Sequence, residues 1–200
     1  MAFHLEPDGN MQRVSVTADT VGAVNLIFRV SDRFQSSFNR TTGCSESFSK
    51  QIIEGRRQVN SDLKFDYARS KAVYTEKNLI SGISKQQDAD IPSCVTDSLS
   101  AIFYAASQPM TVGQSFELSL GDTMKTIPVT MKIEGREQVS TPAGTFQTLR
   151  VEPTADAGVV KNRGNIWIWY TDDDKHMPVQ MRARFFWGTI TFRLTSVDSR

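Results

Sequence analysis

The chain has 200 residues, and its 23 Lys+Arg and 22 Asp+Glu residues leave a formal net charge of +1. This length predicts one domain, residues 1–200, with a single core. The near balance of charge excludes the basic surface of a nucleic-acid-binding protein, and no apolar run reaches the roughly 18 residues of a transmembrane helix. We therefore expect no nucleic acid as a partner and no transmembrane segment.

Two cysteines bear on the cellular compartment. Cys44 in TTGCSES and Cys94 in IPSCVTD both lie in polar, turn-rich contexts, which favours a disulfide over buried thiols. Closing this loop of about 50 residues would stabilise the fold by roughly 4 kcal/mol through chain entropy. The alternative is a pair of unrelated cytosolic thiols. A disulfide would indicate an oxidising compartment, and we expect any export signal to be absent from this sequence because MAFHLEPDG lacks signal-peptide character.

Apolar residues alternate with polar ones along most of the chain, which is typical of antiparallel strands. The clearest segments are residues 24–30, 63–67, 116–120 and 127–133. Turn signals separate them at intervals typical of hairpins in sandwiches or barrels. We expect an all-β dominated fold, either a curved antiparallel sheet or an incomplete β-barrel.

One segment has helical periodicity instead. Its apolar residues recur at i, i+3, i+4 and i+7: Leu99, Ile102, Phe103 and Ala106. Thr96 or Asp97 can cap its start and Pro109 follows its end, so we place one amphipathic helix at about 97–107. The polar, weakly periodic stretch 79–92 is interpreted as a long loop or lid leading into this helix.

The last third of the chain predicts two consecutive hairpins. Residues 166–170, Ile-Trp-Ile-Trp-Tyr, are apolar at both parities, so the strand is either dry on both faces or has an aromatic-lined cavity on one. From 179 to 187 the apolar residues are odd-numbered, and beyond Gly188 they are even-numbered. Such a switch at a glycine predicts a tight turn or a bulge.

The acid-rich segment TDDDKHMP, residues 171–178, lies where the first of these hairpins reverses. Aspartates cap turn amides and Pro178 suits a strand start, so a solvated turn explains every residue. A metal site built from Asp172, Asp174 and His176 is the alternative, but the spacing matches no known metal loop. We expect no metal and no cofactor.

Catalytic signals are weak. The chain has only two histidines, and no serine elbow, P-loop, dinucleotide fingerprint or Cys-x-x-Cys is present. We therefore assign no catalytic residue and expect no enzyme, although catalysis by strand carboxylates stays open. Arg182, Arg184 and Arg193 either line a positive cavity mouth or pair with acids across strands; we favour the pairing.

Three motifs resemble the bacterial family named domain of unknown function 3108. They are DSLSAIFYAAS, GREQVSTPAGTFQTLRVEP and WIWYTDDDKHMPVQM followed by WGTITFRL, covering roughly residues 90–197 and, more faintly, 63–72. The matching positions are Asp97 and Ser100; Gly135, Glu137, Val139, Thr141, Pro142, Gly144 and Phe146; and Trp169, an acid at 172–174, Pro178 and Val179. The resemblance implies an exported or lipoprotein-type protein of Gram-negative bacteria, and it implies no activity.

The leading hypothesis is a periplasmic or envelope-located, non-enzymatic carrier of a hydrophobic, lipid-like ligand, similar in shape to lipoprotein-carrier folds. Each candidate for lining its cavity is also a candidate for plain core: Phe103, Trp167, Trp169, Met181, Phe185 and Trp187. The alternative is a cell-envelope protein–protein interaction module with a packed barrel. A hydrolase is the third possibility, and it requires a cluster of titratable groups in one pocket.

Overall fold

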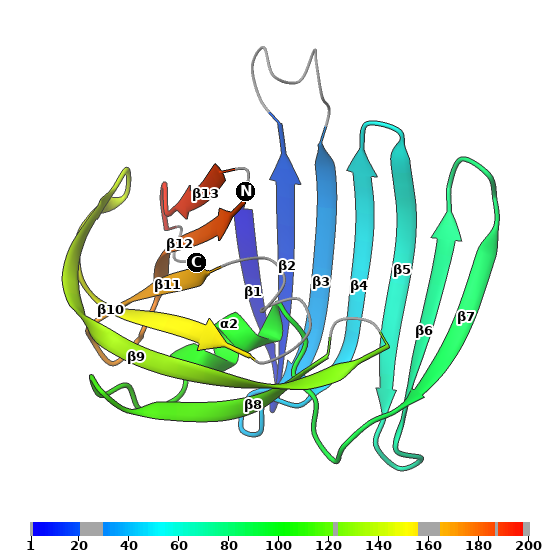
Figure 1. Cartoon of the computed structure of the whole chain (residues 1–200), viewed down its shortest axis with the longest axis horizontal. Helices are drawn as coiled ribbons and strands as arrows, with labels where there is room; N and C mark the ends of the chain where they lie inside the picture. The colour runs from blue at the N-terminus through cyan, green and yellow to red at the C-terminus, as the bar shows by residue number, and fades with distance from the viewer. Residues whose placement is uncertain (1, 21–29, 122–123, 156–164, 187, 198–200) are drawn as a thin grey trace. The chain divides into compact units, whose positions relative to one another are not determined.

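A computed structural model describes residues 2–20, 30–121, 124–155, 165–186 and 188–197. Within these ranges the chain forms two antiparallel sheets and one α-helix, which confirms the predicted all-β dominated fold with one helix (Figure 1). Most of the strand predicted at 24–30 lies outside the described residues, as does Trp187. Val30 is described and forms an isolated antiparallel bridge with Glu54.

The first sheet contains seven strands in chain order, each antiparallel to the next. Its strands are β1 (Ala2–Asp8), β2 (Met11–Asp19), β3 (Ser31–Asn39), β4 (Ser45–Glu54), β5 (Arg57–Asp66), β6 (Lys71–Asn78) and β7 (Ser84–Asp90). In β5 the odd-numbered residues from Val59 to Phe65 are buried, and Lys64 between Leu63 and Phe65 is exposed. The predicted alternation therefore places one face of the sheet on a core and the other in water.

The interpretation of residues 79–92 as a long loop was wrong. Residues Ser84–Asp90 form β7, which pairs with β6 in a continuous register from Lys77↔Ser84 to Lys71↔Asp90. Only residues 79–83 form the turn between the two strands. The sequence SKQQDAD has no apolar alternation because β7 is an edge strand that is exposed along almost its whole length.

The second sheet contains six strands in the order β13-β12-β11-β10-β9-β8. Its strands are β8 (Ser115–Gly121), β9 (Thr126–Thr141), β10 (Gly144–Thr154), β11 (Ile166–Thr171), β12 (Pro178–Phe185) and β13 (Gly188–Arg193). The parity switch at Gly188 is a tight turn, as predicted: Phe185 pairs with Gly188, whose φ is +153°. The two predicted C-terminal hairpins are therefore confirmed.

The helix α2 spans Ser100–Ala106, which is shorter than the predicted 97–107. Asp97 precedes it and accepts hydrogen bonds at Oδ1 from the amides of Leu99 and Ser100, at 2.8 and 2.9 Å, so the predicted cap is confirmed. The difference in length arises because residues 97–99 form this cap and not a helical turn. Within the described residues, no helix is long and apolar enough to cross a membrane.

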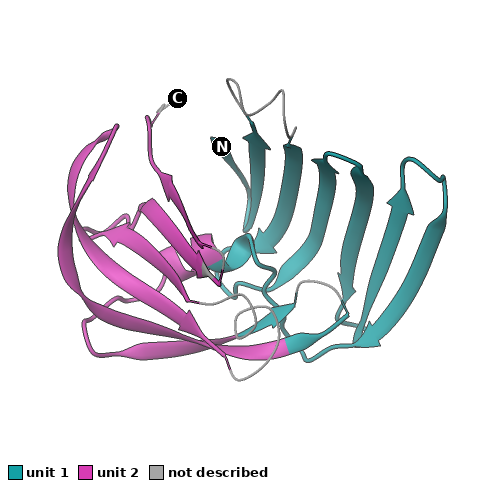
Figure 2. Cartoon of the chain, turned by 45° about the horizontal axis from the view of Figure 1, so that its top comes forward, with its two compact units in different colours: residues 1–101, 119–126 teal, residues 102–118, 127–200 magenta. Residues whose placement is uncertain are grey.

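The chain divides into two compact units (Figure 2). Unit 1 contains residues 1–101 and 119–126, and unit 2 contains residues 102–118 and 127–200. In unit 1 the residues Val14, Phe48, Leu63 and Val95 are buried; in unit 2 the buried residues include Ile133, Leu149, Val151 and Tyr170. Each unit thus buries apolar residues of its own.

Candidate functional site

The tryptophan-rich strand β11 of unit 2 presents different chemistry on its two faces. Tyr170 and Ile168 point to one face, and Trp167 and Trp169 point to the other, because successive residues of a strand alternate. We call these the helix-side face and the tryptophan face. Trp169 is paired with Arg150 on β10 and with Gln180 on β12, so these residues share the tryptophan face.

The helix-side face packs on α2. The Tyr170 hydroxyl donates a hydrogen bond to the Ile102 carbonyl oxygen at 2.9 Å, and His176 Nδ1 lies 3.0 Å from the Ala106 carbonyl oxygen. Tyr170 is fully buried, and burial raises the pKa of its hydroxyl. Leu149 is paired with Tyr170 and is also buried. This end of the face is therefore a closed core.

The same face becomes more exposed toward the sheet edge at β13. Two rungs of paired residues cross β11, β12 and β13: Ile168–Met181–Phe192 and Ile166–Ala183–Ile190. Ile168 and Ala183 are buried, whereas Met181, Phe192 and Ile166 are half-buried and Ile190 is 37 % exposed. Unit 2 thus has a partly exposed apolar surface beside its core, which we call the β13 apolar surface.

Arginines cover the tryptophan face. The Arg182 guanidinium lies 5.3 Å from the ring centroid of Trp169, and the Arg184 guanidinium lies 5.3 Å from that of Trp167. These are cation–π contacts and not the predicted pairs with acids across strands. Arg193 Nε instead donates to Gln180 Oε1 at 3.1 Å. Among the described residues, these three arginines therefore contact two aromatic rings and an amide, and the expected pairing with acids is not found there.

An acid holds the indole nitrogen of Trp169. Its indole Nε1 donates to Glu137 Oε1 at 2.8 Å, and Arg150 Nη1 donates to the same oxygen at 3.1 Å. Arg150 Nε also donates to Glu134 at 2.8 Å. Trp169 is only 3 % exposed and packs with Val139 and Val179. Its ring is therefore held in place by the protein and offers no open platform to a ligand.

The described residues among the six predicted to line one cavity include members on both faces of the sheet. Trp167 and Trp169 occupy the tryptophan face, and Met181 lies on the helix-side face. Phe185 has the parity of Met181 and is paired with Gly188, while Phe103 is half-buried on α2. Trp187 lies outside the described residues. The register places Met181 on the β13 apolar surface.

The acid-rich turn between β11 and β12 is tied to its own backbone. Asp173 Oδ1 accepts hydrogen bonds from the Thr171 hydroxyl at 2.7 Å and from the amides of Lys175 and His176 at 3.0 and 3.2 Å. The Thr171 hydrogen bond is the main reason why the pKa of Asp173 is lowered. Within the described residues, no group of three or more His, Cys, Asp or Glu side chains is placed to hold a metal ion.

The predicted disulfide between Cys44 and Cys94 is present in unit 1, with Cα atoms 5.0 Å apart. The next residues continue this connection, because the Ser45 amide donates to the Val95 carbonyl oxygen at 2.7 Å. The Tyr67 hydroxyl donates to the Ser45 carbonyl oxygen at 2.7 Å, and burial raises the pKa of Tyr67 to about 12. A covalent bond and backbone hydrogen bonds together hold the segment before α2 to β4.

A fully buried carboxylate, Asp97, lies beside this connection. Its Oδ2 accepts hydrogen bonds from the Ser36 and Ser45 hydroxyls, both at 2.6 Å, and its Oδ1 accepts the two amides at the start of α2. Burial raises the pKa of Asp97, and the serine hydrogen bonds oppose that increase. The sequence pattern predicted the cap but not its serine partners, which lie 61 and 52 residues away.

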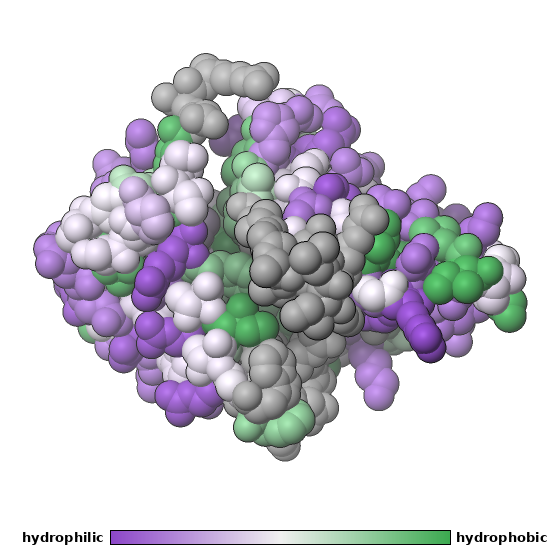
Figure 3. Space-filling view, turned by 90° about the horizontal axis from the view of Figure 1, so that it is seen from above, coloured by the Kyte–Doolittle hydropathy of each residue, from purple (hydrophilic) through white to green (hydrophobic). Residues whose placement is uncertain are grey.

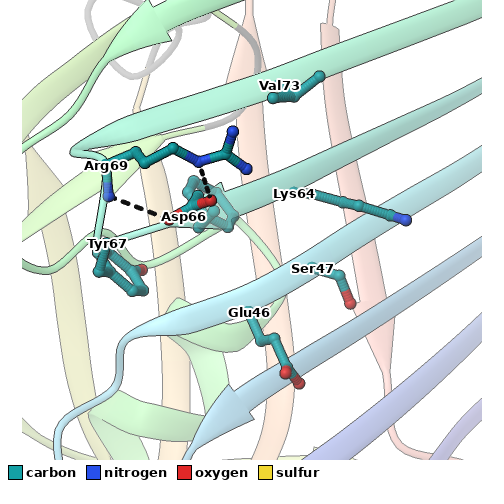
Figure 4. Close-up of a pocket in the computed structure, with 8 residues that line it drawn as sticks. Glu46, Ser47, Lys64, Asp66, Tyr67, Arg69 and Val73 are labelled. Atoms are coloured by element: carbon teal, nitrogen blue, oxygen red, sulfur yellow. Dashed lines mark hydrogen bonds and ion pairs between the residues drawn. The ribbon is translucent and has the colours of Figure 1, made fainter.

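Unit 1 also has a pocket of about 620 Å³ on the water-facing side of β4, β5 and β6 (Figure 4). Ser47, Lys64 and Val73 lie in register across these strands at its centre. At one end Asp66 accepts hydrogen bonds from Arg69 Nε at 2.7 Å and from the Arg69 amide at 3.0 Å. This Arg69 contact lowers the pKa of Asp66. Charged groups of Glu46, Lys64, Asp66 and Arg69 line this pocket beside the apolar side chains of Phe65 and Val73.

Comparison with known proteins agrees with the resemblance noted in the sequence. The family model described as "Protein of unknown function (DUF3108)" matches residues 1–195. The chain belongs to this family. The match extends beyond the motifs at 90–197 and includes the whole of the first sheet. No curated protein matches the chain.

A solved structure shares the fold of this DUF3108 protein. It is titled as a β-barrel-like protein of domain of unknown function DUF1849 from Brucella abortus, and it is similar with a TM-score of 0.61 at 8 % sequence identity. The similarity covers 97 % of this chain and 85 % of the other. At this identity the similarity shows the fold alone.

Proposed function

We propose that this protein is an exported, non-enzymatic carrier that holds a hydrophobic, lipid-like ligand on the β13 apolar surface. One observation carries the proposal: Ile166, Met181, Ile190 and Phe192 lie on the same face of neighbouring strands and are left partly exposed. A ligand that covered them would remove apolar area from water, at about 25 cal/mol per Å².

The contrast with the other face of the same strands supports this choice. The polar groups of the tryptophan face are occupied by cation–π contacts and hydrogen bonds within unit 2. The exposed side chains of the β13 apolar surface have no polar group to bond. A hydrophobic ligand is the partner that suits such a surface, because it needs contact area and few hydrogen bonds.

The disulfide supports the export part of the proposal. Disulfides persist in oxidising compartments and are rare in the cytosol of mesophilic organisms. The Cys44–Cys94 bond is therefore compatible with a periplasmic or envelope location. The non-enzymatic part is supported by the acids that sequence motifs highlighted, since Asp97 and Asp173 serve as hydrogen-bond acceptors for nearby backbone and hydroxyl groups.

The test compares two neighbouring residues of β13. Ile190 lies on the β13 apolar surface, and Thr189, which pairs with Arg184, lies on the opposite face of the same strand. We expect Ile190→Glu to weaken binding of the fluorescent fatty acid cis-parinaric acid about tenfold or more, because a carboxylate would enter an apolar contact. Thr189→Glu adds the same charge to the same exposed strand and should leave binding unchanged.

Native mass spectrometry of the non-reduced protein, with lipid extraction of the same sample, checks whether a ligand is already bound. A co-purifying acyl species that is lost from Ile190→Glu and retained by Thr189→Glu would support the carrier. An empty protein that binds no cis-parinaric acid, or equal binding by the two variants, would contradict it.

The second candidate is an envelope interaction module, and the edge strand β13 favours it. Its sequence GTITFR is largely exposed and has one charged residue, Arg193. The edge strand β7 of the first sheet instead carries three charged residues: Lys85, Asp88 and Asp90. Charged edges resist pairing with another strand, and β13 lacks that protection. A photo-crosslinker at Thr191 that captures one envelope protein, when the same group at Gln86 captures none, would favour this function.

A further inference from the structure

The turn between β6 and β7 in unit 1 exposes large apolar side chains. Leu79, Ile80 and Ile83 are 38, 63 and 70 % exposed. Apolar atoms gather at the right-hand end of the space-filling view, over the β6–β7 hairpin (Figure 3). Hairpin turns normally consist of polar residues, glycine and proline, so three aliphatic side chains in a five-residue turn require an explanation. We call these three residues the apolar tip.

The backbone of the apolar tip is fixed by hydrogen bonds. The Asn78 amide donates to the Ile83 carbonyl oxygen at 2.9 Å, and Asn78 Oδ1 accepts the amides of Ile80 and Ser81 at 2.9 and 3.0 Å. Gly82, with φ +73°, donates to the Asn78 carbonyl oxygen at 2.9 Å. These hydrogen bonds fix the backbone of the turn, and its aliphatic side chains stay exposed. Polar side chains would fit the same backbone.

Basic residues surround the apolar tip. Lys77 and Lys85 are near the two ends of the turn. The Leu79 amide donates to the Gln58 carbonyl oxygen at 2.9 Å, so the neighbouring β4–β5 turn lies at the same end of the sheet. Arg56 lies in that turn, and Arg57 follows it at the start of β5. Glu54 pairs with Arg57 at 3.2 Å and Glu76 pairs with Lys85 at 2.9 Å. These four basic and two acidic residues leave an excess of positive charge around the tip.

We propose that the apolar tip inserts into the interfacial region of a lipid bilayer that contains anionic lipids. Aliphatic side chains that project beyond a basic ring are suited to such a membrane, because the side chains enter the acyl boundary while the cations contact anionic headgroups. The tip is too small to be a stable protein–protein interface, which buries about 800 Å² on each partner. This inference does not depend on the proposed carrier function.

Co-sedimentation with vesicles tests the proposal on the intact, oxidised chain. We expect binding to vesicles of phosphatidylethanolamine and phosphatidylglycerol that is weaker with phosphatidylcholine alone and weaker at high salt. The double variant Ile80→Asp/Ile83→Asp should lose about tenfold or more of this binding. Val197→Asp is the matched control, because Val197 is 56 % exposed elsewhere in the chain, and it should bind as the wild type does.

A second measurement detects insertion directly in the folded protein. Ile83→Cys labelled with the fluorophore NBD should shift its emission to the blue and brighten when anionic vesicles are added, and Val197→Cys labelled in the same way should not change. Failure of the wild type to sediment with anionic vesicles would overturn the proposal. So would equal sedimentation of Ile80→Asp/Ile83→Asp, or wild-type self-association that this variant abolishes without any vesicle binding.

Discussion

Two hairpin turns of this protein have opposite chemistry. The turn between β11 and β12 is DDDKHM, and its Asp173 accepts hydrogen bonds from two amides of the turn and from the hydroxyl of Thr171 at the end of β11. The turn between β6 and β7 is LISGI, and its apolar side chains extend into water. From the sequence the first was interpreted as a solvated turn, with a metal site as the alternative, and the second was taken as part of a polar loop. In the structure the acids of the first turn bond within the protein, Asp173 to the turn amides and Asp172 to Arg136, whereas the aliphatic side chains of the second turn are exposed.

This difference shows where an external partner is to be sought. A charged group whose hydrogen bonds are all made within the protein stabilises the fold, and its removal should lower stability. An exposed apolar group contributes little to the fold, and its removal should alter an interaction. Asp97 belongs with the first kind, because its carboxylate is buried among four donors.

The largest expected effect concerns the connection next to Asp97. The double variant Cys44→Ser/Cys94→Ser should unfold at lower urea concentration, with a loss of about 4 kcal/mol in the free energy of unfolding, because the unfolded chain gains the freedom of an open 50-residue loop. Equilibrium urea denaturation measures this. Reduced wild type should behave like the variant, and an unchanged midpoint would show that the hydrogen bonds alone hold the segment.

The next effect concerns Asp97 itself. Asp97→Ala should lower the free energy of unfolding by about 3 kcal/mol, because the Ser36 and Ser45 hydroxyls and the first amides of α2 lose their acceptor in a buried site. Asp97→Asn retains one oxygen acceptor and should lose less. A loss of under about 1 kcal/mol in Asp97→Ala would mean that Asp97 is not part of the structural framework.

The free energy of unfolding should also depend on pH differently in the wild type and in Asp97→Asn. Burial raises the pKa of Asp97 in the folded protein, so the folded state binds this proton more tightly than the unfolded chain does. Its contribution to stability is therefore fully present below the unfolded pKa and is lost as the pH rises through the raised pKa. The stability of wild type relative to Asp97→Asn should decrease with rising pH across this range, as urea denaturation at several pH values would measure.

The smallest effects compare the two turns directly. Asp173→Ala should lower the free energy of unfolding by about 1–2 kcal/mol, since one oxygen accepts the Thr171 hydroxyl and two amides of the turn. Ile80→Ser, at a side chain that is 63 % exposed, should change it by no more than about 0.5 kcal/mol. Thermal unfolding of both variants checks this, and the reverse order would break the distinction between the turns.

Local patterns in the sequence were sufficient for much of the fold. Alternation identified the buried face of β5, helical spacing with Asp97 located α2, and the parity switch at Gly188 predicted the last turn. The polar contexts of Cys44 and Cys94 predicted their disulfide. Each of these features depends on residues that are close in the chain or, for the cysteines, on a residue type whose usual role in such a context is a disulfide.

Tertiary structure alone decided which residues share a face. Alternation shows which residues of one strand share a face. Which residues of β11 and β12 share a face depends on how the two strands pair: Trp169 pairs with Gln180, and the register shifts before Tyr170. That register separates the tryptophans from Met181. The strand β7 was likewise invisible in the sequence, because its pairing depends on backbone hydrogen bonds to β6 and not on an apolar side-chain pattern.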